Sequence, residues 1–378
     1  MKVMVGLSGG VDSAVAAYLL IQQDYEVVGG FMRNWDALAN GDYLGNPTAN
    51  DPQCPQEKDY DDAKKVAEKL GIPLLRADFV KEYWDDVFSY FLSEYRKGRT
   101  PNPDVFCNKY IKFDRFLEFA LKQGCDKIAM GHYAKKVEDE NGLSYIYKAA
   151  DKSKDQSYFL CQINERQISS CLFPLADIPK TEVRRIAHEL DLSSVMDKKD
   201  STGVCFIGER HFREFLSNYL PSKKGDIIDG GTGKVVGTHK GVMYYTLGQR
   251  KGLGIGGIKG IDATGGYFIY KKDVEKNILY VAKVSDIELL NSDRCVVDNV
   301  NWIGPKPEGE IEVGVKYRYR QQDQRAILHF EGDRIVLEYS FAPVQAVTPG
   351  QIAAIYQGEK MLGGGIINEV FYKGEKVS

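Results

Sequence analysis

The stretch KVMVGLSGGVDSAVAAYLLIQQ, residues 2–23, decides the fold class of this chain. Residues 2–7 predict a short buried strand, and residues 12–23 have the composition and apolar spacing of a helix. A loop of glycine and serine joins the two. Because parallel α/β sheets bind ligands at such strand-to-helix turns, the stretch predicts an α/β domain with a ligand site at its first loop.

The joining loop has the composition of a phosphate-binding turn, and its candidate nucleotide-binding residues are Gly6, Leu7, Ser8, Gly9, Gly10, Val11, Asp12 and Ser13. Glycine lets the backbone point its N–H groups at an anion, serine adds hydroxyl donors, and the helix N-terminus adds a favourable field. The loop has neither the Gly-Lys-Ser/Thr ending of a Walker loop nor GxGxxG. We expect Asp12 to face the phosphates through Mg²⁺, because a carboxylate beside phosphate needs a cation. A plain strand-to-helix turn is the alternative.

Further strands and helices alternate along the first half of the chain. Strands are predicted at 26–32, 73–79 and 126–131, and helices at 57–70, 80–97 and 108–123. This order predicts a parallel sheet covered by helices on both faces.

The pattern changes after about Gly203, where glycine and tyrosine become dense. Short β-like runs replace the helices, at 241–246, 267–270, 278–284 and 335–339, with glycine-rich turns between them. We therefore predict three domains: a catalytic α/β domain at 1–205, a small β-rich central domain at 206–280, and a C-terminal β-barrel at 281–378.

Composition excludes several classes of protein. The 378 residues carry 50 Lys+Arg against 53 Asp+Glu, so any nucleic-acid site must be a local basic patch. No apolar run reaches the roughly 18 residues of a spanning helix, and the opening residues do not resemble a signal peptide. We expect a cytosolic chain without a membrane partner. Seven scattered cysteines without zinc-finger spacing predict neither a disulfide scaffold nor a metal site.

Two cysteines have distinctive surroundings. Cys107 follows RTPNPD at 99–104 and is predicted to open a helix, where the thiolate would be stabilised. Cys205 lies in DSTGVCFIG at 200–208, a glycine-flanked loop suited to exposure. The alternative for each is a small buried residue. That alternative is our prediction for the remaining five, Cys54, Cys125, Cys161, Cys171 and Cys295.

Five segments together resemble the tRNA-specific 2-thiouridylases and span most of the chain without a departure at these motifs. They are GLSGGVDS, NPDVFCN, KSKDQS, STGVCFIGER and TLGQRKGLGI, in that order. The loop SGGVDS by itself resembles that of the ATP pyrophosphatases, which transfer AMP to an oxygen and release pyrophosphate. The resemblance implies an adenine nucleotide alpha hydrolase-like domain, a small central domain and a C-terminal β-barrel.

The resemblance also implies an activity, conversion of a tRNA wobble uridine to 2-thiouridine with ATP and a relayed persulfide sulfur. ATP would activate the uracil C2 oxygen, and a sulfur-donor protein would load Cys205. Sulfur would then attack C2 directly, or Cys107 would release it as hydrosulfide; either route leaves a Cys107–Cys205 disulfide. Asp104 would act as general base or orient the base. Met32 and Gly131 resemble adenine or ribose contacts, although core packing explains Met32 equally well.

A basic and aromatic segment at 316–325, KYRYRQQDQR, suits stacking on single-stranded bases with phosphate pairing, and a strand with a solvated basic face is the alternative. By resemblance, the target base would be contacted by Asn102, Pro103 and Asp104. Further tRNA contacts implied by resemblance are His132, Lys154, Asp155, Gln156, Arg318, Tyr319 and Gln351. A lone histidine such as His132 is more often structural. We expect a monomer.

Two other functions remain open from the sequence. An amide-forming or argininosuccinate-type ligase of the same loop family explains the loop but gives Cys107, Cys205 and the β-rich half no role. A non-catalytic RNA-binding protein that senses ATP predicts that both cysteines are dispensable.

Overall fold

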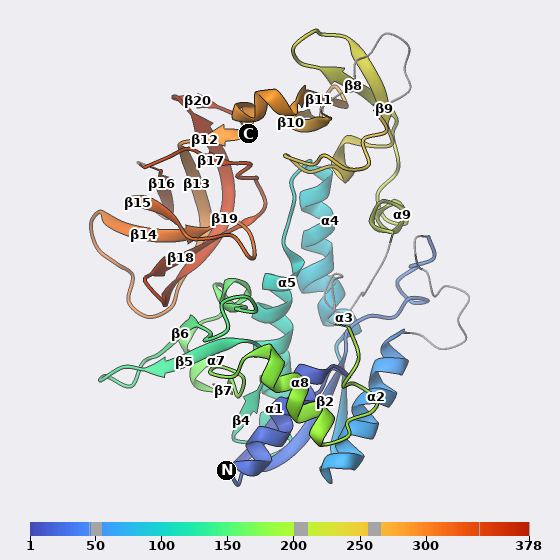
Figure 1. Cartoon of the computed structure of the whole chain (residues 1–378), viewed down its shortest axis with the longest axis vertical. Coiled ribbons are helices and arrows are strands. Elements are labelled where there is room, and N and C mark those ends of the chain that lie inside the picture. Colours follow the sequence, from blue (N-terminus) through green and yellow to red (C-terminus); the bar gives the residue numbers. More distant parts are fainter. Residues whose placement is uncertain (45, 47–54, 200–210, 256–265, 340, 378) are drawn as a thin grey trace.

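The computed structural model describes residues 1–44, 46, 55–199, 211–255, 266–339 and 341–377. A parallel sheet forms the N-terminal part, a small sheet forms the central part, and a barrel forms the C-terminal part (Figure 1). This arrangement confirms the predicted fold class. In the described part of the chain, no helix is both long and apolar enough to cross a membrane.

The N-terminal sheet has the strand order β3-β2-β1-β4-β7, and all its pairs are parallel. Its strands are β1 (Lys2–Gly6), β2 (Glu26–Arg33), β3 (Leu74–Asp78), β4 (Lys127–Ala129) and β7 (Cys171–Leu172). The order reverses direction at β1, so the loops after β1 and β4 lead away from each other. A crevice at the carboxyl ends of these two strands is where such sheets bind ligands.

Successive side chains of strand β1 are buried on opposite faces of the sheet. Val3 and Val5 pack in one cluster with the helices α1 (Val11–Gln22), α2 (Pro55–Leu70) and α8 (Lys180–Glu189). Met4 packs in another, beneath the helices between β3 and β4. Successive residues of a strand point to opposite faces, so this alternation buries both faces, as the sequence predicted.

The second face is covered by two long helices that include π-helical turns. The first runs through α3 (Val80–Tyr83), a π-helical turn (Trp84–Phe88) and α4 (Ser89–Arg96). The second runs through α5 (Pro103–Phe106), a π-helical segment (Cys107–Arg115) and α6 (Phe116–Lys122).

The prediction that Cys107 opens this second helix is wrong. The helix begins at Pro103 with Asn102 as its N-cap, and Cys107 follows one turn later. Proline is favoured at the first helical position because its fixed φ suits the helix and its missing N–H would have no intrahelical partner there. The second proline of the RTPNPD segment therefore starts the helix.

The central part is a four-stranded sheet with the order β10-β11-β8-β9. Its elements are α9 (Phe212–Ser217), β8 (Gly225–Asp229), β9 (Val235–His239), β10 (Tyr267–Asp273) and β11 (Ile278–Lys283). The strand predicted at 241–246 is wrong, because Val242–Tyr244 is a single 3-10 turn that follows Gly241 at φ +152°. A short apolar run fits a buried turn as well as a strand.

The C-terminal part is a closed barrel of six strands. Pairing runs β13-β16-β15-β14-β18-β19 and closes by β13 against β19. These are β13 (Arg294–Trp302), β14 (Ile311–Lys316), β15 (Gln324–Glu331), β16 (Arg334–Glu338), β18 (Ile352–Gln357) and β19 (Lys360–Tyr372). The short strands β12 (Asn291–Ser292) and β17 (Val344–Gln345) pair nearby, and β20 (Glu375–Lys376) pairs with β19.

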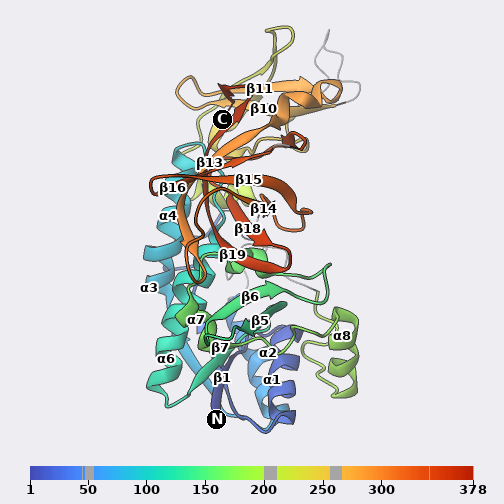
Figure 2. The same cartoon turned by 90° about the vertical axis from the view of Figure 1, so that its left-hand side faces the viewer.

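A hairpin of the first domain joins the barrel. It consists of β5 (Ala134–Glu138) and β6 (Ser144–Lys148), and Tyr147 pairs with Lys360 of β19. Figure 2 shows the hairpin between the parallel sheet and the barrel. A 3-10 turn (Ser157–Leu160) and α7 (Glu165–Ser169) follow it.

Barrel closure requires glycine at position 363. Gly363 has φ +143°, and a Cβ there would lie 1.9 Å from the Asn301 carbonyl oxygen of β13. We predict that Gly363→Ala lowers the free energy of unfolding by about 3 kcal/mol, from backbone strain and overpacking. Gly332→Ala, where φ is +62° but nothing lies within 4 Å, should cost about 1 kcal/mol. Equal melting temperatures of the two variants in calorimetry would contradict this.

Candidate active site

The loop from Gly6 to Ser13, called the phosphate loop below, is held against β2 and α2 by contacts of its backbone. Leu7 N–H donates to the Gly30 carbonyl oxygen at 2.9 Å, which continues the parallel pairing past β1. Gly9 has φ +69°, and a Cβ there would lie 2.3 Å from the Asp59 carbonyl oxygen. Only glycine fits that position, so this part of the sequence prediction has a steric basis.

Two serine hydroxyls meet inside the loop. The Ser8 N–H donates to Ser13 Oγ at 3.2 Å, and the two Oγ atoms are 3.3 Å apart. Ser13 Oγ donates to the Gly10 carbonyl oxygen at 2.9 Å. The first N–H groups of α1 have no intrahelical acceptor, as at the start of any α-helix, and this arrangement suits an anion.

Lysine reaches the loop from elsewhere in the chain. Lys198 Nζ donates to the Gly9 carbonyl oxygen at 2.9 Å, and it also bonds Asp59 Oδ1 at 2.7 Å and Asp62 Oδ2 at 3.0 Å. The loop is thereby tied to α2 by a cation that comes from a segment beyond α8. The sequence pattern did not single out Lys198, because it lies 189 residues from Gly9.

Asp12 does not stand alone at the start of α1. Its carboxylate accepts from Lys180 Nζ at 2.7 and 2.8 Å and from the Tyr133 hydroxyl at 2.8 Å. Lys180 is the first residue of α8, and Tyr133 lies just after β4. Neither residue was found from the sequence.

Gly131 and Gly6 each allow a close approach beside the loop. A Cβ on Gly131 would lie 2.9 Å from Ser13 N, so its backbone passes directly against the first turn of α1. A Cβ on Gly6 would lie 2.9 Å from Met130 Sδ and 3.2 Å from Met32 Cε. Met32 is buried near the end of β2. The structure therefore brings Gly131 and Met32 to the carboxyl edge of the sheet, next to the loop.

The segment before Cys107 is bound to both other domains. Thr100 N–H donates to the Pro349 carbonyl oxygen at 3.0 Å, and Gln351 Nε2 donates to the Thr100 carbonyl oxygen at 2.8 Å. The Thr100 hydroxyl lies 3.3 Å from the Thr246 hydroxyl of the central domain. Arg99 donates to the Ile367 carbonyl oxygen of β19 at 2.8 Å.

The three residues predicted to contact the target base come immediately after this segment in the chain. Pro103 is buried, whereas Asn102 and Asp104 are half-buried. The Asn102 Oδ1 atom is buried without a hydrogen-bond partner. Asp104 and Cys107 are three positions apart on one helix, a spacing that places residues on the same side.

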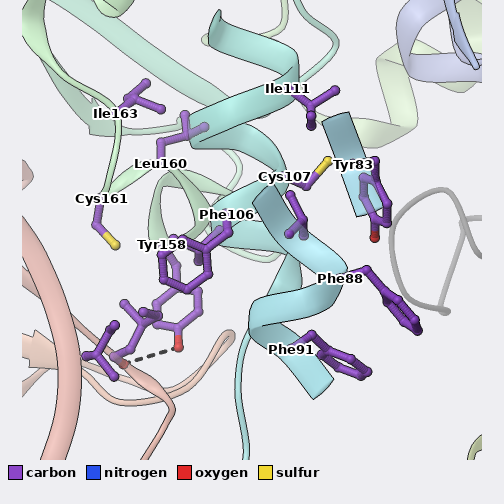
Figure 3. Close-up of a cluster of buried hydrophobic side chains, with 14 of the residues drawn as sticks. Tyr83, Phe88, Phe91, Phe106, Cys107, Ile111, Tyr158, Leu160, Cys161 and Ile163 are labelled. Atoms are coloured by element: carbon purple, nitrogen blue, oxygen red, sulfur yellow. Dashed lines mark hydrogen bonds between the residues drawn. The ribbon is translucent and has the colours of Figure 1, made fainter. Parts of the chain in front are cut away.

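Cys107 is fully buried. Figure 3 shows it projecting from its helix on the side of Tyr83, within a cluster of aromatic side chains. Cys161 belongs to the same cluster but lies on another segment, and burial raises its thiol pKa to about 12. Cys125, Cys171 and Cys295 are buried free thiols as well, which confirms the prediction for them. Cys54 and Cys205 lie outside the described residues.

The predicted contacts at 154–156 belong to a turn that is hydrogen-bonded to the residues before β5 and after β6 and to the end of β14. Asp155 is buried, and its carboxylate accepts from Ala149 N–H at 3.0 Å, Ser157 Oγ at 2.9 Å and Lys316 Nζ at 3.3 Å. Gln156 Oε1 accepts from Tyr133 N–H at 3.0 Å. Lys154 is half-buried. The hydrogen bonds of Asp155 and Gln156 are structural.

The remaining predicted tRNA contacts lie around the same turn. Tyr319 packs against Phe159 with ring centroids 4.6 Å apart and the rings tilted by 46°, and exposed Arg318 donates to the Ala346 carbonyl oxygen at 2.6 Å. Both lie in the turn between β14 and β15, not on a strand. Half-buried His132 has a buried Nδ1 atom without a partner, and burial lowers its pKa well below the usual value. His132 is therefore neutral.

Comparison with known proteins decides the family. Three family models match in succession: a tRNA methyl transferase HUP domain at 1–209, a tRNA methyl transferase PRC-barrel domain at 213–283 and an aminomethyltransferase beta-barrel domain at 292–367. The tRNA-specific 2-thiouridylase MnmA of Mycoplasma capricolum is 52% identical over 98% of this chain and 99% of the relative. That of Metamycoplasma arthritidis is 53% identical over 99% and 98%.

The chain belongs to the tRNA-specific 2-thiouridylase family. The predicted resemblance is thus confirmed over nearly the whole length. A solved U34-tRNA thiolase, NcsA of Methanococcus maripaludis, aligns over 55% of this chain and 62% of that one, with 22% identity and a TM-score of 0.32. That likeness is too weak to carry an argument.

We predict that Lys198→Met weakens ATP binding roughly threefold to tenfold, because Gly9 loses its cationic partner and Asp59 and Asp62 lose their neutralising charge. Lys69→Met is the control, since Lys69 forms an exposed pair with Asp191 at 3.4 Å at the far end of α2. Equilibrium dialysis of radiolabelled ATP measures both. An unchanged ATP affinity in Lys198→Met would show that the bond to Gly9 has no part in nucleotide binding.

Proposed function

We propose that this chain is an ATP-dependent tRNA sulfurtransferase that converts the wobble uridine to 2-thiouridine. The observation that carries the proposal is the identity of about half of all residues, across all three domains, with relatives of that name. The geometry adds support, because the phosphate loop and the 99–107 segment belong to one α/β domain whose active-site segment is bound by both others. The domain boundaries at 205 and 280 are part of this proposal.

ATP would bind at the carboxyl ends of β1 and β4. Its phosphates would accept from the loop of Gly6 to Ser13, and its adenosine would lie against the backbone of Met32 and Gly131. The described residues contain no cluster of three or more metal-ligating side chains. Both oxygens of Asp12 already accept from Lys180. Mg²⁺ would arrive with ATP and neutralise part of its phosphate charge, and Asp12 would then be shared between that cation and Lys180.

The reaction would run in two stages. The uracil C2 oxygen attacks the α-phosphorus of ATP, pyrophosphate leaves, and the C2–O–AMP bond makes that oxygen a good leaving group. In the second stage, sulfur from a Cys205 persulfide forms the C2–S bond as AMP leaves. Cys107 then attacks Cys205 Sγ and breaks the S–S bond to the transferred sulfur, which stays on C2. Alternatively, Cys107 attacks Cys205 Sγ first, the S–S bond of the persulfide breaks, and the released hydrosulfide attacks C2. Both routes end in a Cys107–Cys205 disulfide, which an external thiol reduces.

The buried state of Cys107 sets a condition on this mechanism. A thiol with no exposed surface cannot meet a persulfide, so tRNA or Cys205 must displace part of the surrounding cluster. Asp104 would orient the base or take its proton, one turn before Cys107. The unpartnered Oδ1 of Asn102 would accept from a base N–H.

The partners would approach from the barrel side of the site. Arg318, Tyr319, Lys154 and His132 would contact tRNA, whereas Asp155, Gln156 and Gln351 would shape the surface through their structural bonds. We further propose a persulfide-carrying donor protein, a monomeric enzyme and a cytosolic reaction. An amide-forming or argininosuccinate-type ligase, or an ATP-sensing RNA-binding protein, would leave both cysteines without a role.

Thiolation of unmodified tRNA tests the function directly. The protein is incubated with tRNA, ATP, Mg²⁺ and a persulfide donor, and the digested tRNA is analysed for 2-thiouridine by mass. We expect ATP-dependent product from the native chain and from Cys125→Ser, a buried thiol away from the site. Cys205→Ser and Cys107→Ser should form under 1% of it, at nearly unchanged tRNA affinity, since each removes a reacting sulfur. Full thiolation by Cys205→Ser would remove the persulfide assignment.

A second experiment addresses tRNA binding. We predict that Arg318→Ala weakens tRNA binding and lowers the slope of log K against log salt by about one, because a phosphate contact releases about one counterion. Arg325→Ala is the matched control, since Arg325 lies in the same basic segment but pairs with Glu312 at 2.8 Å. If both variants keep the native slope, Arg318 makes no phosphate contact.

A further inference from the structure

Lys180 lies next to the phosphate loop, although no sequence pattern indicated this. Its Nζ is 2.7 and 2.8 Å from the two oxygens of Asp12, the second residue of α1. Only 11% of the Lys180 side chain is exposed, against 32% of Asp12. A cation is thus fixed in a nearly closed environment next to the loop that is proposed to bind ATP.

Several contacts set the position of Lys180. Its backbone N–H donates to Asp151 Oδ2 at 3.0 Å, which fixes the start of α8. Its ammonium lies 5.9 Å from the centre of the Tyr133 ring, and the Tyr133 hydroxyl donates to Asp12 Oδ1 at 2.8 Å. The ammonium is therefore pre-positioned from three elements rather than placed by its own flexible stem, which lowers the entropy cost of using it.

The charges at the loop require a cation. ATP carries its charge mainly on the β- and γ-phosphates, and a Walker loop meets it with its own lysine. This loop has no lysine, and it places the carboxylate of Asp12 in the first turn of α1. Without a compensating charge, that carboxylate would repel the phosphates.

We propose that Lys180 binds the β- and γ-phosphates of ATP and supplies the cation that the phosphate loop lacks. The inference rests on the proposed function, in which ATP is cleaved to AMP and pyrophosphate. Asp12 holds the ammonium in place. When ATP binds, the ammonium bridges Asp12 and the phosphate oxygens, and it stabilises the pyrophosphate as that group leaves.

A purely structural role for Lys180 makes different predictions. As an ion pair between α1 and α8, Lys180 would affect stability but not distinguish nucleotides. As a neutraliser of Asp12 alone, it would become dispensable once Asp12 is replaced by asparagine. These two roles are separable from phosphate binding by affinity measurements on the full-length protein.

The experiment measures dissociation constants for ATP and AMP by isothermal titration calorimetry. We expect Lys180→Met to weaken ATP binding roughly 10- to 100-fold, as for loss of a charge-assisted hydrogen bond, and AMP binding less than about twofold. Lys180→Arg, which keeps the charge, should recover most of the ATP affinity. Lys135→Met is the matched control, because its pair with Asp177 at 2.9 Å anchors the segment just before α8 without touching the loop.

A double-variant cycle isolates the phosphate contact. We expect Lys180→Met to weaken ATP binding by a similar factor in the Asp12→Asn background, because the contact to phosphate does not depend on Asp12. Loss of the effect in that background, or equal weakening of ATP and AMP, would overturn the proposal. If Lys180→Met lowers the melting temperature, the ATP affinities of Lys180→Arg and Lys180→Gln are compared instead, and a weaker affinity is expected only for Lys180→Gln. If the native chain itself fails to bind ATP, the proposed function fails. If the native chain binds ATP and the Lys180 variants bind it equally tightly, this inference alone fails.

Discussion

Residues 99–101 are the point at which all three domains are hydrogen-bonded together, through the backbone of Thr100 and its side-chain hydroxyl. The barrel contributes the Pro349 carbonyl oxygen and the Gln351 side chain to Thr100, and the central domain contributes the Thr246 hydroxyl. Gly350 is required there, since a Cβ would lie 2.9 Å from Thr100 N. The next residues form the N-cap and first turn of the helix that carries Cys107. The barrel therefore determines where the proposed base-contacting residues lie.

This constraint gives the two further domains a part in positioning the segment before Cys107. The phosphate loop is completed within the first domain, by Lys180 and Lys198 from the segment after the sheet. The 99–107 segment is completed only by the other two. The residues proposed to bind nucleotide and those proposed to bind the base are thus held by different sets of contacts, so we expect a substitution in the barrel to impair base binding without impairing nucleotide binding.

Much of this arrangement was predictable from local sequence. The alternation of strands and helices, the loop at Gly9 and the β-rich C-terminal half depend on nearby residues, and the structure has them. The helix start at Pro103 and the 3-10 turn at Val242 were not predicted correctly, because proline and short apolar runs fit two local structures. Lys180, Lys198 and the contact of Gln351 with Thr100 could not be found, since each joins residues more than 160 positions apart. Only the fold brings them together.

The proposed mechanism depends on which atom ATP activates. The direct measurement uses tRNA whose target uridine carries a heavy oxygen isotope at C2, incubated with the protein, ATP and a persulfide donor. Mass analysis then locates the label after thiolation. Adenylation of the C2 oxygen predicts that the heavy oxygen leaves with AMP, bound to its phosphorus, in an amount equal to the 2-thiouridine formed. Unlabelled AMP alongside 2-thiouridine would contradict adenylation of the C2 oxygen.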